Sequence, residues 1–434
     1  MKNIVLSSLL TLSTSLICTF ANASNPTGFE QSSLAFSPMA DFSDEFNANQ
    51  INTSKWENAP KSLVIGAWSF VPENTYVKNG VLNIDVTQET HTRPFHDSCW
   101  DGVAGGSAKL TQRELYYKSG AIRTAADTVY GFYEAKIKGV KMFPGLSPAF
   151  WLYSDGHPFP DSHVEGSVDY SEIDIVELQQ ADWHGPKKDD ADPVNVMDHN
   201  LHARIVGKNG KKIWRRPKAF RETQLLNYHA PFDPSEDFHT YAVENRKDRI
   251  FWYVDGNLVG SKANLFWHRP MHLILSMGLR RHFIKFNGKC QRADPHPDNV
   301  TKKGFPEDAN MQIEYVRSWQ IEPSIWLASS QMTNQSLALS FDYHAGSTEE
   351  VIKGNTNGIE LSVVEVKNGK IVKHLKGITD KSVLDGDKKY AGSSQFKLDL
   401  AEFNKPLTDL AVIAMFSSSN GNEIQSQLIP ISNL

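Results

Sequence analysis

The sequence predicts an all-β protein, in which a large jelly-roll β-sandwich is followed by a smaller β-sandwich-like module. From about residue 36 to residue 322, short stretches of alternating apolar and polar residues are divided by Gly, Pro and Asn turns. No helical period competes with this pattern over a useful length. Many short antiparallel strands in succession are typical of a jelly roll.

Five segments mark the expected strands in chain order. Residues 77–86 predict a hairpin with an Asn-Gly turn, and residues 250–259 predict a second hairpin that turns at Asp-Gly. Residues 130–138 alternate cleanly between apolar and polar side chains. Residues 272–277 and 311–319 close the series. We therefore assign residues 38–322 to one large β-sandwich domain.

The pattern of apolar and polar residues changes near Glu322. We expect residues 323–335 to form a linker and residues 336–434 to form an accessory β module, because residues 336–343 and 359–364 show a new strand pattern. This tail has no cysteine and no Trp after Trp326. Glycan binding and a structural or anchoring role both stay open for it.

The N-terminus has the features of an export signal. Lys2 precedes an apolar segment, residues 4–20, and residues 21–23 form an A-x-A-like cleavage site. We expect residues 1–23 to be removed after Ala23, and the mature protein to be secreted or periplasmic. No later segment is apolar enough to predict a membrane span.

Two cysteines remain after the signal, Cys99 and Cys290. In an exported protein two lone cysteines usually pair. Such a bridge would stabilise the fold by about 4–5 kcal/mol on the chain-entropy model. Two free thiols are the alternative, and the lack of a Cys-x-x-Cys spacing argues against zinc.

Charge and aromatic content point to the kind of ligand. The net charge of −5 gives no reason to expect nucleic acid as a partner, whereas ten Trp residues suit a carbohydrate binder. Basic residues gather beside aromatic or turn residues in 214–218, 267–270 and 279–282. Guanidinium groups bind oxyanions through two hydrogen bonds, so these segments favour a sulfated or carboxylated glycan. Solvated basic loops are the alternative.

Three acids lie within an apolar segment, residues 171–178, that otherwise predicts a buried strand. Strand side chains alternate, so Glu172 and Asp174 project to the same face. Glu177 lies five positions after Glu172, which puts it on the opposite face of a regular strand. A one-residue β-bulge would return it to the same face, and such bulges are enriched beside active sites.

Convergent carboxyls of this kind have a chemical use. Two carboxyls about 5–5.5 Å apart are the machinery of a retaining glycosidase. Three close carboxyls cannot all ionise cheaply, so the pKa of one is expected to rise, and that group can protonate a leaving oxygen. A solvated polar strand face is the alternative, but the flanking residues are too apolar for it.

The acid cluster has the pattern Glu-x-Asp-x-x-Glu and resembles glycoside hydrolase family 16, whose members have a concanavalin-like jelly roll. The resemblance covers residues 38–322 and includes segments in family order: 44–46, 143–151, 237–241, 252–256 and 315–319. Within the family, the sequence is most similar to κ-carrageenases. Residues 170–178, 264–269 and 275–280 carry that likeness.

The resemblance implies roles for the acids. Glu172 corresponds to the nucleophile, Glu177 to the general acid/base, and Asp174 to the group between them that holds the nucleophile. It also places His202 on a strand beside the acids, although a buried core histidine is the alternative reading.

The resemblance also implies substrate contacts. Trp151 would lie under the scissile sugar, and Arg216 and Arg280 match positions that meet the 4-sulfate of galactose. The expected substrate-binding set is Trp68, Trp151, His202, Trp214, Arg216, Trp267 and Arg280. Each of these Trp side chains could instead belong to the core.

Two features depart from the family pattern. Arg215 and Arg281 are additional cations, and the insert 183–192 lies within a polar segment, 179–200, that we expect to be a binding loop. Members of the family often carry a structural calcium ion on the convex face, but no Asp-rich loop here marks such a site. We expect no required cofactor and no catalytic metal.

The expected function is that of a secreted, monomeric, retaining endo-glycosidase. The implied substrate is a sulfated red-algal galactan, above all κ-carrageenan, cleaved at internal β-1,4-galactosidic linkages. Furcellaranase, agarase or porphyranase activity, transglycosylation, and a non-catalytic glycan-binding sandwich are the alternatives. Neither a nucleic-acid partner nor a membrane is expected.

Overall fold

The computed structural model describes residues 25–63, 66–96, 110–141, 144–154, 159–179, 192–281, 283–287, 292–300, 305, 309–352 and 358–434. The expected signal peptide, the two cysteines expected to pair and most of the insert 183–192 lie outside these residues. Within the described ranges, none of the helices combines the length and the apolar character that a membrane crossing requires.

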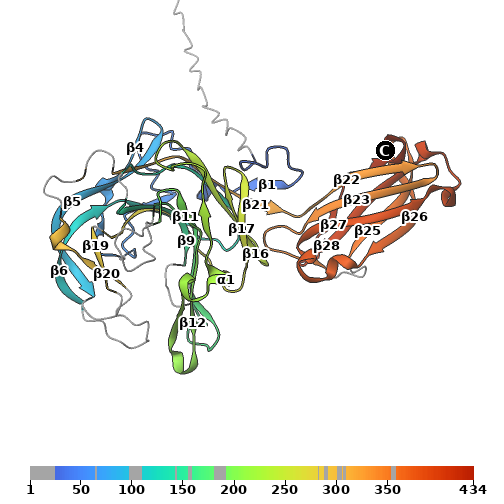
Figure 1. Ribbon diagram of the computed structural model, residues 1–434. Coiled ribbons are helices and arrows are strands. Elements are labelled where there is room, and N and C mark those ends of the chain that lie inside the picture. The colour runs from blue at the N-terminus through green and yellow to red at the C-terminus, as the bar shows by residue number, and fades with distance from the viewer. Residues whose placement is uncertain are drawn as a thin grey trace, which may run out of the picture.

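Two large sheets, antiparallel apart from the parallel pair of β3 (Ser69–Phe70) and β6 (Leu110–Ser119), form the first domain, and the prediction of an all-β fold is confirmed (Figure 1). The sheet that we call the β8 sheet contains, in spatial order, β17 (Asn257–Ala263), β16 (Arg249–Val254), β15 (His239–Asn245), β8 (Gly131–Lys138), β21 (Asn310–Glu322), β5 (Val81–His96), β6 (Leu110–Ser119) and β3 (Ser69–Phe70), with β1 (Ala35–Pro38) and β4 (Thr75–Lys78) attached. The β10 sheet contains β13 (Lys212–Arg215), β12 (Leu201–Val206), β10 (Val168–Glu177), β9 (Leu146–Tyr153), β18 (His272–Leu279), β7 (Ala121–Thr124) and β2 (Trp56–Asn58), with β11 (Val196–Asp198) and β14 (Asn227–His229) attached.

Smaller elements connect these strands. A separate hairpin pairs β19 (Ile284–Asn287) with β20 (Arg292–Pro295), and α1 (Arg221–Gln224) is one short turn. The 3-10 helices of the described chain are η1 (Ala40–Phe42), η2 (Pro72–Asn74), η3 (Lys208–Gly210), η4 (Pro217–Ala219), η5 (Pro297–Asn299), η6 (Ser382–Leu384), η7 (Gly386–Lys389), η8 (Leu400–Phe403), η9 (Leu407–Asp409) and η10 (Ile431–Asn433).

The main hydrophobic core lies between the two sheets, and β9 shows how the alternation of side chains places it. Phe150 and Leu152 join this core, together with apolar residues of β5, β8 and β16. Ala149, Trp151 and Tyr153 point the other way and form a separate apolar cluster. The strand is therefore buried on both faces. Its second face packs against Leu63 and Phe70 rather than against the main core.

Both predicted hairpins are confirmed. Asn79 and Gly80 join β4 to β5 with φ of 54° and 75°, and Asp255 and Gly256 join β16 to β17 with φ of 48° and 72°. A two-residue turn with positive φ at both positions matches the twist of the strands, which explains why Asn-Gly and Asp-Gly occur there.

The C-terminal module packs a sheet of β22 (Ser324–Thr333), β23 (Ser336–His344) and β27 (Ala391–Asp399) against a second sheet. That second sheet contains β24 (Val351–Ile352), β28 (Leu410–Ser418), β25 (Ile359–Lys367), β26 (Lys370–Asp380), β29 (Glu423–Gln425) and β30 (Ile429–Pro430). The expected linker 323–335 is corrected by the structure, because most of it is β22 and Ile325 belongs to the core of the module. The module thus begins directly after Pro323.

The two domains touch along this short connection. The backbone N–H of Ser347 donates to the carbonyl of Ile321 over 3.0 Å, and the Ser347 hydroxyl accepts from the Ile321 N–H over 3.1 Å. Arg249 pairs with Asp387 across the junction at 3.1 Å. In Figure 1 the module, drawn in orange to red, extends from the side of the sandwich where β16, β17 and β21 lie.

The expected binding loop 179–200 is corrected in part. Its end forms β11, in which Asp198 pairs with Glu177 of β10 and with Asn227 of β14. Residues 180–191 lie outside the described chain.

Candidate active site

The three acids lie on one face of β10. In an antiparallel sheet, residues paired in register share a face. Glu172 pairs with Tyr153, Asp174 with Trp151, and Glu177 with Ala149. These three partners alternate along β9 on the face away from the main core. Glu172, Asp174 and Glu177 therefore all face away from the β8 sheet.

A bulge at Ile175 produces this arrangement. The register between β10 and β9 shifts between Asp174 and Val176, so Ile175 is the extra residue. The predicted one-residue bulge is confirmed. Without it, Glu177 would share the face of Ile173, which is fully buried in the main core.

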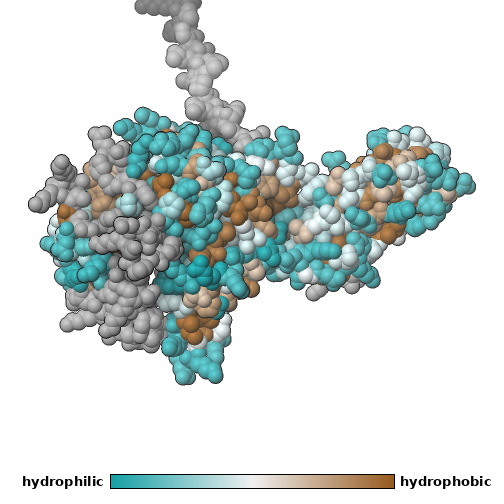
Figure 2. Space-filling view, viewed as in Figure 1, coloured by the Kyte–Doolittle hydropathy of each residue, from teal (hydrophilic) through white to brown (hydrophobic). Residues whose placement is uncertain are grey.

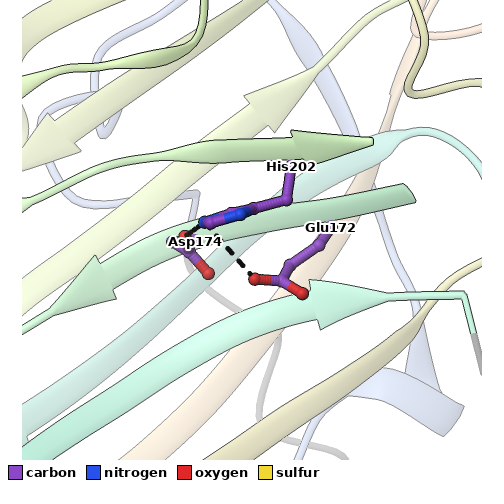
Figure 3. A group of neighbouring side chains, drawn as sticks. All are labelled: Glu172, Asp174 and His202. Carbon is purple, nitrogen blue, oxygen red and sulfur yellow. Dashed lines mark ion pairs between the residues drawn. The ribbon is translucent and has the colours of Figure 1, made fainter. Parts of the chain in front are cut away.

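His202 lies between two of the acids. It comes from β12, where it pairs in register with Glu172. Its Nε2 atom lies 3.3 Å from Asp174 Oδ2 and 3.6 Å from Glu172 Oε1, and Figure 3 shows the ring facing both carboxylates. The structure thus brings His202 into the acid cluster.

Glu177 has a different partner. Its Oε1 accepts a hydrogen bond from Arg280 Nη2 over 2.8 Å, and both side chains retain some solvent contact. Arg280 follows directly after β18, which pairs with β9 on the side opposite to β10. The cation expected to meet a sulfate therefore contacts the expected general acid in the free protein.

The pKa values of two acids are raised. Burial, with a smaller contribution from Asp174, raises the pKa of Glu177 to about 7, although Arg280 and His202 oppose the rise. Burial also raises the pKa of Asp174 well above its usual range, and the negative charges of Glu172 and Asp198 add to the effect. A carboxyl with a pKa near 7 can donate a proton at neutral pH.

Tyr170 is a site residue that the sequence reasoning missed. Its hydroxyl donates to Glu172 Oε2. Tyr170 stands two positions before Glu172 in an alternating strand, so the same parity argument that joined Glu172 to Asp174 could have found it.

Aromatic rings continue from the acids across the β10 sheet. Trp151 contacts Tyr153 with ring centroids 5.0 Å apart, Tyr153 contacts Tyr170 at 6.3 Å, and Tyr170 contacts Trp214 at 5.1 Å. The Trp151 indole donates to the hydroxyl of Ser276 over 3.1 Å. We call these four rings the aromatic row.

Cations border the far end of the aromatic row. The guanidinium of Arg216 lies 4.4 Å from the ring centroid of Trp214, and that of Arg204 lies 5.2 Å from it. Arg216 is exposed, whereas Arg204 is held by Asp169 at 2.9 Å. The additional cation Arg215 points elsewhere, because its guanidinium stacks 3.6 Å from the ring of Phe220.

The hairpin of β12 and β13 carries this end of the row and projects from the sandwich (Figure 1). Figure 2 shows apolar residues on its flank and hydrophilic ones at its tip. Ile213, on this hairpin, is 47% exposed. Trp214, the last ring of the row, lies on β13 of this hairpin.

One residue of the expected substrate-binding set, Trp267, is corrected by the structure. It is fully buried in the main core, and its indole donates to the carbonyl of His202 over 3.0 Å. Trp267 therefore supports the strand that carries His202. Trp68 packs in the main core and is 5% exposed, against 6% for Trp151 of the aromatic row, so burial does not distinguish these two expected platforms.

Glu172, Asp174 and His202 could also hold a metal ion, since their ligand atoms lie within 4.8 Å of one another. These are the same groups that the acid chemistry requires. Tyr170 already donates to Glu172, and His202 already faces both acids. The contacts among these side chains therefore account for their closeness without a metal ion.

A family model described as the GH16 domain of β-porphyranases A–D matches residues 36–321. This chain belongs to glycoside hydrolase family 16. The predicted family and the predicted class of enzyme, a glycoside hydrolase, are both confirmed.

Two κ-carrageenases resemble this family 16 chain. That of Pseudoalteromonas carrageenovora is 44% identical over 279 residues, which are 64% of this chain and 63% of that protein. Its crystal structure with an oligotetrasaccharide of κ-carrageenan aligns with a TM-score of 0.57 and 40% identity, over 66% of this chain and 96% of the crystallised one. A κ-carrageenase of Zobellia galactanivorans aligns with a TM-score of 0.56 and 34% identity, over 67% and 97% of the two chains. The chain thus matches a little under two thirds of its full-length Pseudoalteromonas relative.

A more distant relative is β-porphyranase B of Zobellia galactanivorans. It is 25% identical over 293 residues, which are 66% of this chain and 85% of that protein. The matches to all three relatives fit the first domain in length, and the jelly roll expected from the sequence is confirmed by the two κ-carrageenase structures.

Proposed function

We propose that this protein is an exported, retaining endo-hydrolase of sulfated galactans that cleaves internal β-1,4-galactosidic bonds of κ-carrageenan. The observation that carries the proposal is the convergence of Glu172, Asp174 and Glu177 on one face, through a single bulge. The likeness to two κ-carrageenases supports the choice of substrate.

The acids divide the work in two steps. Glu177, whose pKa is raised to about 7, protonates the glycosidic oxygen while Glu172 attacks the anomeric carbon and forms a glycosyl-enzyme. Glu177, now ionised, takes a proton from water, and the water displaces Glu172 from the sugar. Two displacements at one carbon restore its configuration.

Asp174 supports the nucleophile from the same face of β10. Burial raises the pKa of Asp174 well above its usual range, and the nearby negative charge of Glu172 adds to the rise. Tyr170 donates to Glu172 from one side and His202 faces it from another. These contacts fix the orientation of the nucleophile.

The aromatic row and its cations recognise the polymer. Sugar C–H faces pack on aromatic rings, and a guanidinium can bind a sulfate through two hydrogen bonds. Arg216 is exposed beside Trp214, which suits a sulfate on a sugar that rests on the row. Arg280 would meet a sulfate only near Glu177, to which it is bonded.

A second candidate substrate is porphyran. The match to a β-porphyranase domain and to β-porphyranase B favours it. Digestion of κ-carrageenan, furcellaran, porphyran and agarose, followed by identification of the product ends, distinguishes these activities. We expect κ-carrageenan to be cleaved fastest. Cleavage of agarose alone would refute a role for the arginines in sulfate recognition.

Export and disulfide formation belong to the same proposal. We propose that the mature chain begins at Ser24, that Cys99 pairs with Cys290, and that no cofactor is required. The intact mass of the secreted protein, with and without alkylation under non-reducing conditions, tests the first two points. Unchanged activity after extensive chelation is expected for the third.

A further inference from the structure

The carbonyls of Asp174 and Ile175 lie at the bulge, where the strand that pairs with β10 changes from β12 to β11. On this edge, β10 pairs with β12 up to Ile173 and with β11 at Glu177. The carbonyl of Asp174 accepts a hydrogen bond from Trp252 Nε1 over 2.9 Å, and the carbonyl of Ile175 accepts one from His199 Nδ1 over 2.5 Å. A side-chain ring thus donates to each carbonyl of the bulge.

The two rings approach from different parts of the fold. His199 stands between β11 and β12 in the β10 sheet, and its backbone N–H donates to the carbonyl of Leu226 over 2.8 Å. Trp252 stands on β16 of the β8 sheet and reaches β10 through the main core. Both side chains are fully buried. Two separate parts of the fold therefore each bind one of the two carbonyls of the bulge.

His199 acts as a neutral donor. A carbonyl can only accept, so Nδ1 must carry the ring proton. The other nitrogen, Nε2, is buried and has no hydrogen-bond partner among the described residues. Burial lowers the pKa of His199 to about 4, which keeps the ring uncharged at neutral pH.

The conformation of the bulge decides where Glu177 points. A regular strand through the same residues would turn the Glu177 side chain towards the main core. A bulge that could relax would let Glu177 move relative to Arg280 and the substrate. Small misplacements of a catalytic group reduce rates strongly.

We propose that His199 and Trp252 are positioning residues, which hold the general acid Glu177 in place by binding the two carbonyls of the bulge. This inference rests on the proposed function, in which Glu177 protonates the leaving group. The loss of either ring donor should therefore reduce proton donation rather than substrate binding.

Three variants test the ring donors. His199→Leu removes the donor and keeps much of the volume, His199→Asn restores an N–H close to the position of Nδ1, and Trp252→Phe removes the indole N–H. Trp319→Phe is the matched control, because Trp319 is equally buried in the β8 sheet and its indole N–H has no partner among the described residues.

Two substrates separate positioning from simple packing. κ-Carrageenan has a sugar leaving group that needs a proton, whereas a 2,4-dinitrophenyl glycoside of a κ-carrageenan oligosaccharide releases its aryl group without one. We expect His199→Leu to lower kcat on κ-carrageenan by roughly 10²-fold, with KM changed by less than about threefold. The burst of dinitrophenolate should slow by less than about fivefold, because that step needs no acid.

The remaining variants complete the test. His199→Asn should recover at least about tenfold of the lost kcat, and Trp252→Phe should show the same dependence on the leaving group, unlike Trp319→Phe. Equal losses on both substrates, or wild-type kcat in His199→Leu, would overturn the inference. If His199→Leu does not fold, the contrast between Trp252→Phe and Trp319→Phe decides the question.

Failure of the proposed function would be seen separately. It would show in the wild-type protein as inversion of configuration, or as full κ-carrageenan activity in Glu177→Gln.

Discussion

The family 16 sandwich and the C-terminal module are both built from packed antiparallel sheets, but they bury different kinds of side chain. The sandwich buries carboxyls, among them Asp174, Glu134 and Glu244. In the module, the buried polar side chains of residues 324–352 and 358–434 are His344 and five serines, and none is an Asp, Glu, Lys or Arg. Burial of a carboxyl is unfavourable, so the position of Asp174 within a cluster of three acids, rather than the paired Glu134 and Glu244, indicates where the chemistry resides.

Among the buried polar side chains in residues 324–352 and 358–434, His344 is the one that is not a serine, and it faces the sandwich. His344 Nδ1 accepts a hydrogen bond from the Gly346 N–H over 2.9 Å. Its Nε2 lies 3.3 Å from Arg246 Nη1 and 3.5 Å from Glu244 Oε1, both of which belong to the sandwich. The buried imidazole of the module therefore serves the junction rather than a site of its own.

Substitution of the proposed nucleophile in the sandwich should cause the largest loss of activity. Glu172→Gln should reduce kcat by at least about 10⁴-fold, because the glycosyl-enzyme can no longer form. Initial-rate assays on κ-carrageenan measure the loss. Glu423→Gln, an exposed acid on β29 of the module, is the control and should leave the rate unchanged. Substantial activity in Glu172→Gln would remove the assignment.

Loss of the general acid should be the next largest effect. Glu177→Gln should lower kcat on κ-carrageenan by about 10²–10⁴-fold. In the wild type, Glu177 must be protonated, so kcat/KM should fall as the pH rises through about 7. A pH–rate profile measures this limb, which should be absent from the residual activity of the variant.

The same substitution should change the stability of the sandwich in a pH-dependent way. The pKa of Glu177 is higher in the folded state than in an unfolded chain, so the folded state binds more protons between the two values. Stability therefore falls as the pH rises from the unfolded pKa towards about 7. We expect Glu177→Gln to raise the unfolding temperature at pH 8 and to leave it nearly unchanged at pH 4. Calorimetry at the two pH values tests this, and a lower temperature at pH 8 would contradict it.

Truncation of the aromatic row should have a moderate effect. Trp214→Ala removes the ring on which Arg216 rests, and should raise KM for κ-carrageenan by about tenfold with little change in kcat. Arg216→Gln should give a similar increase that shrinks when the substrate is desulfated. Equal loss on sulfated and desulfated polymer would show that Arg216 does not read sulfate.

The smallest effect on activity is expected at the junction. His344→Leu leaves Glu244 with one fewer buried partner and should destabilise the protein by about 1–3 kcal/mol, while kcat stays within about twofold of the wild type. Denaturant unfolding and κ-carrageenan assays measure the two quantities. A large loss of kcat at unchanged stability would place the module in the catalytic machinery.

Local patterns were enough to predict the parts of the molecule that depend on parity and turn chemistry. The bulge follows from the spacing of Glu172 and Glu177, because only an extra residue can bring both to one face. The hairpins at Asn79 and Asp255 follow from the positive φ that their turns require.

Features that depend on long-range packing could not be predicted from local patterns. A Trp in a loop-like segment has the same sequence signature whether its ring is exposed or, like that of Trp267, buried. His199 reaches β10 from the connection between β11 and β12 and Trp252 from β16, so no local pattern could join them to Ile175 and Asp174. The expected linker failed for a related reason, because β22 becomes a strand only by pairing with β23.

The stereochemistry of cleavage shows whether Glu172 forms a covalent glycosyl-enzyme. Proton NMR of a defined κ-carrageenan oligosaccharide during digestion reports the anomer that appears first, before mutarotation. Because the proposed mechanism has two successive displacements by Glu172 and water, we predict that the β anomer appears first. Initial release of the α anomer would contradict the account.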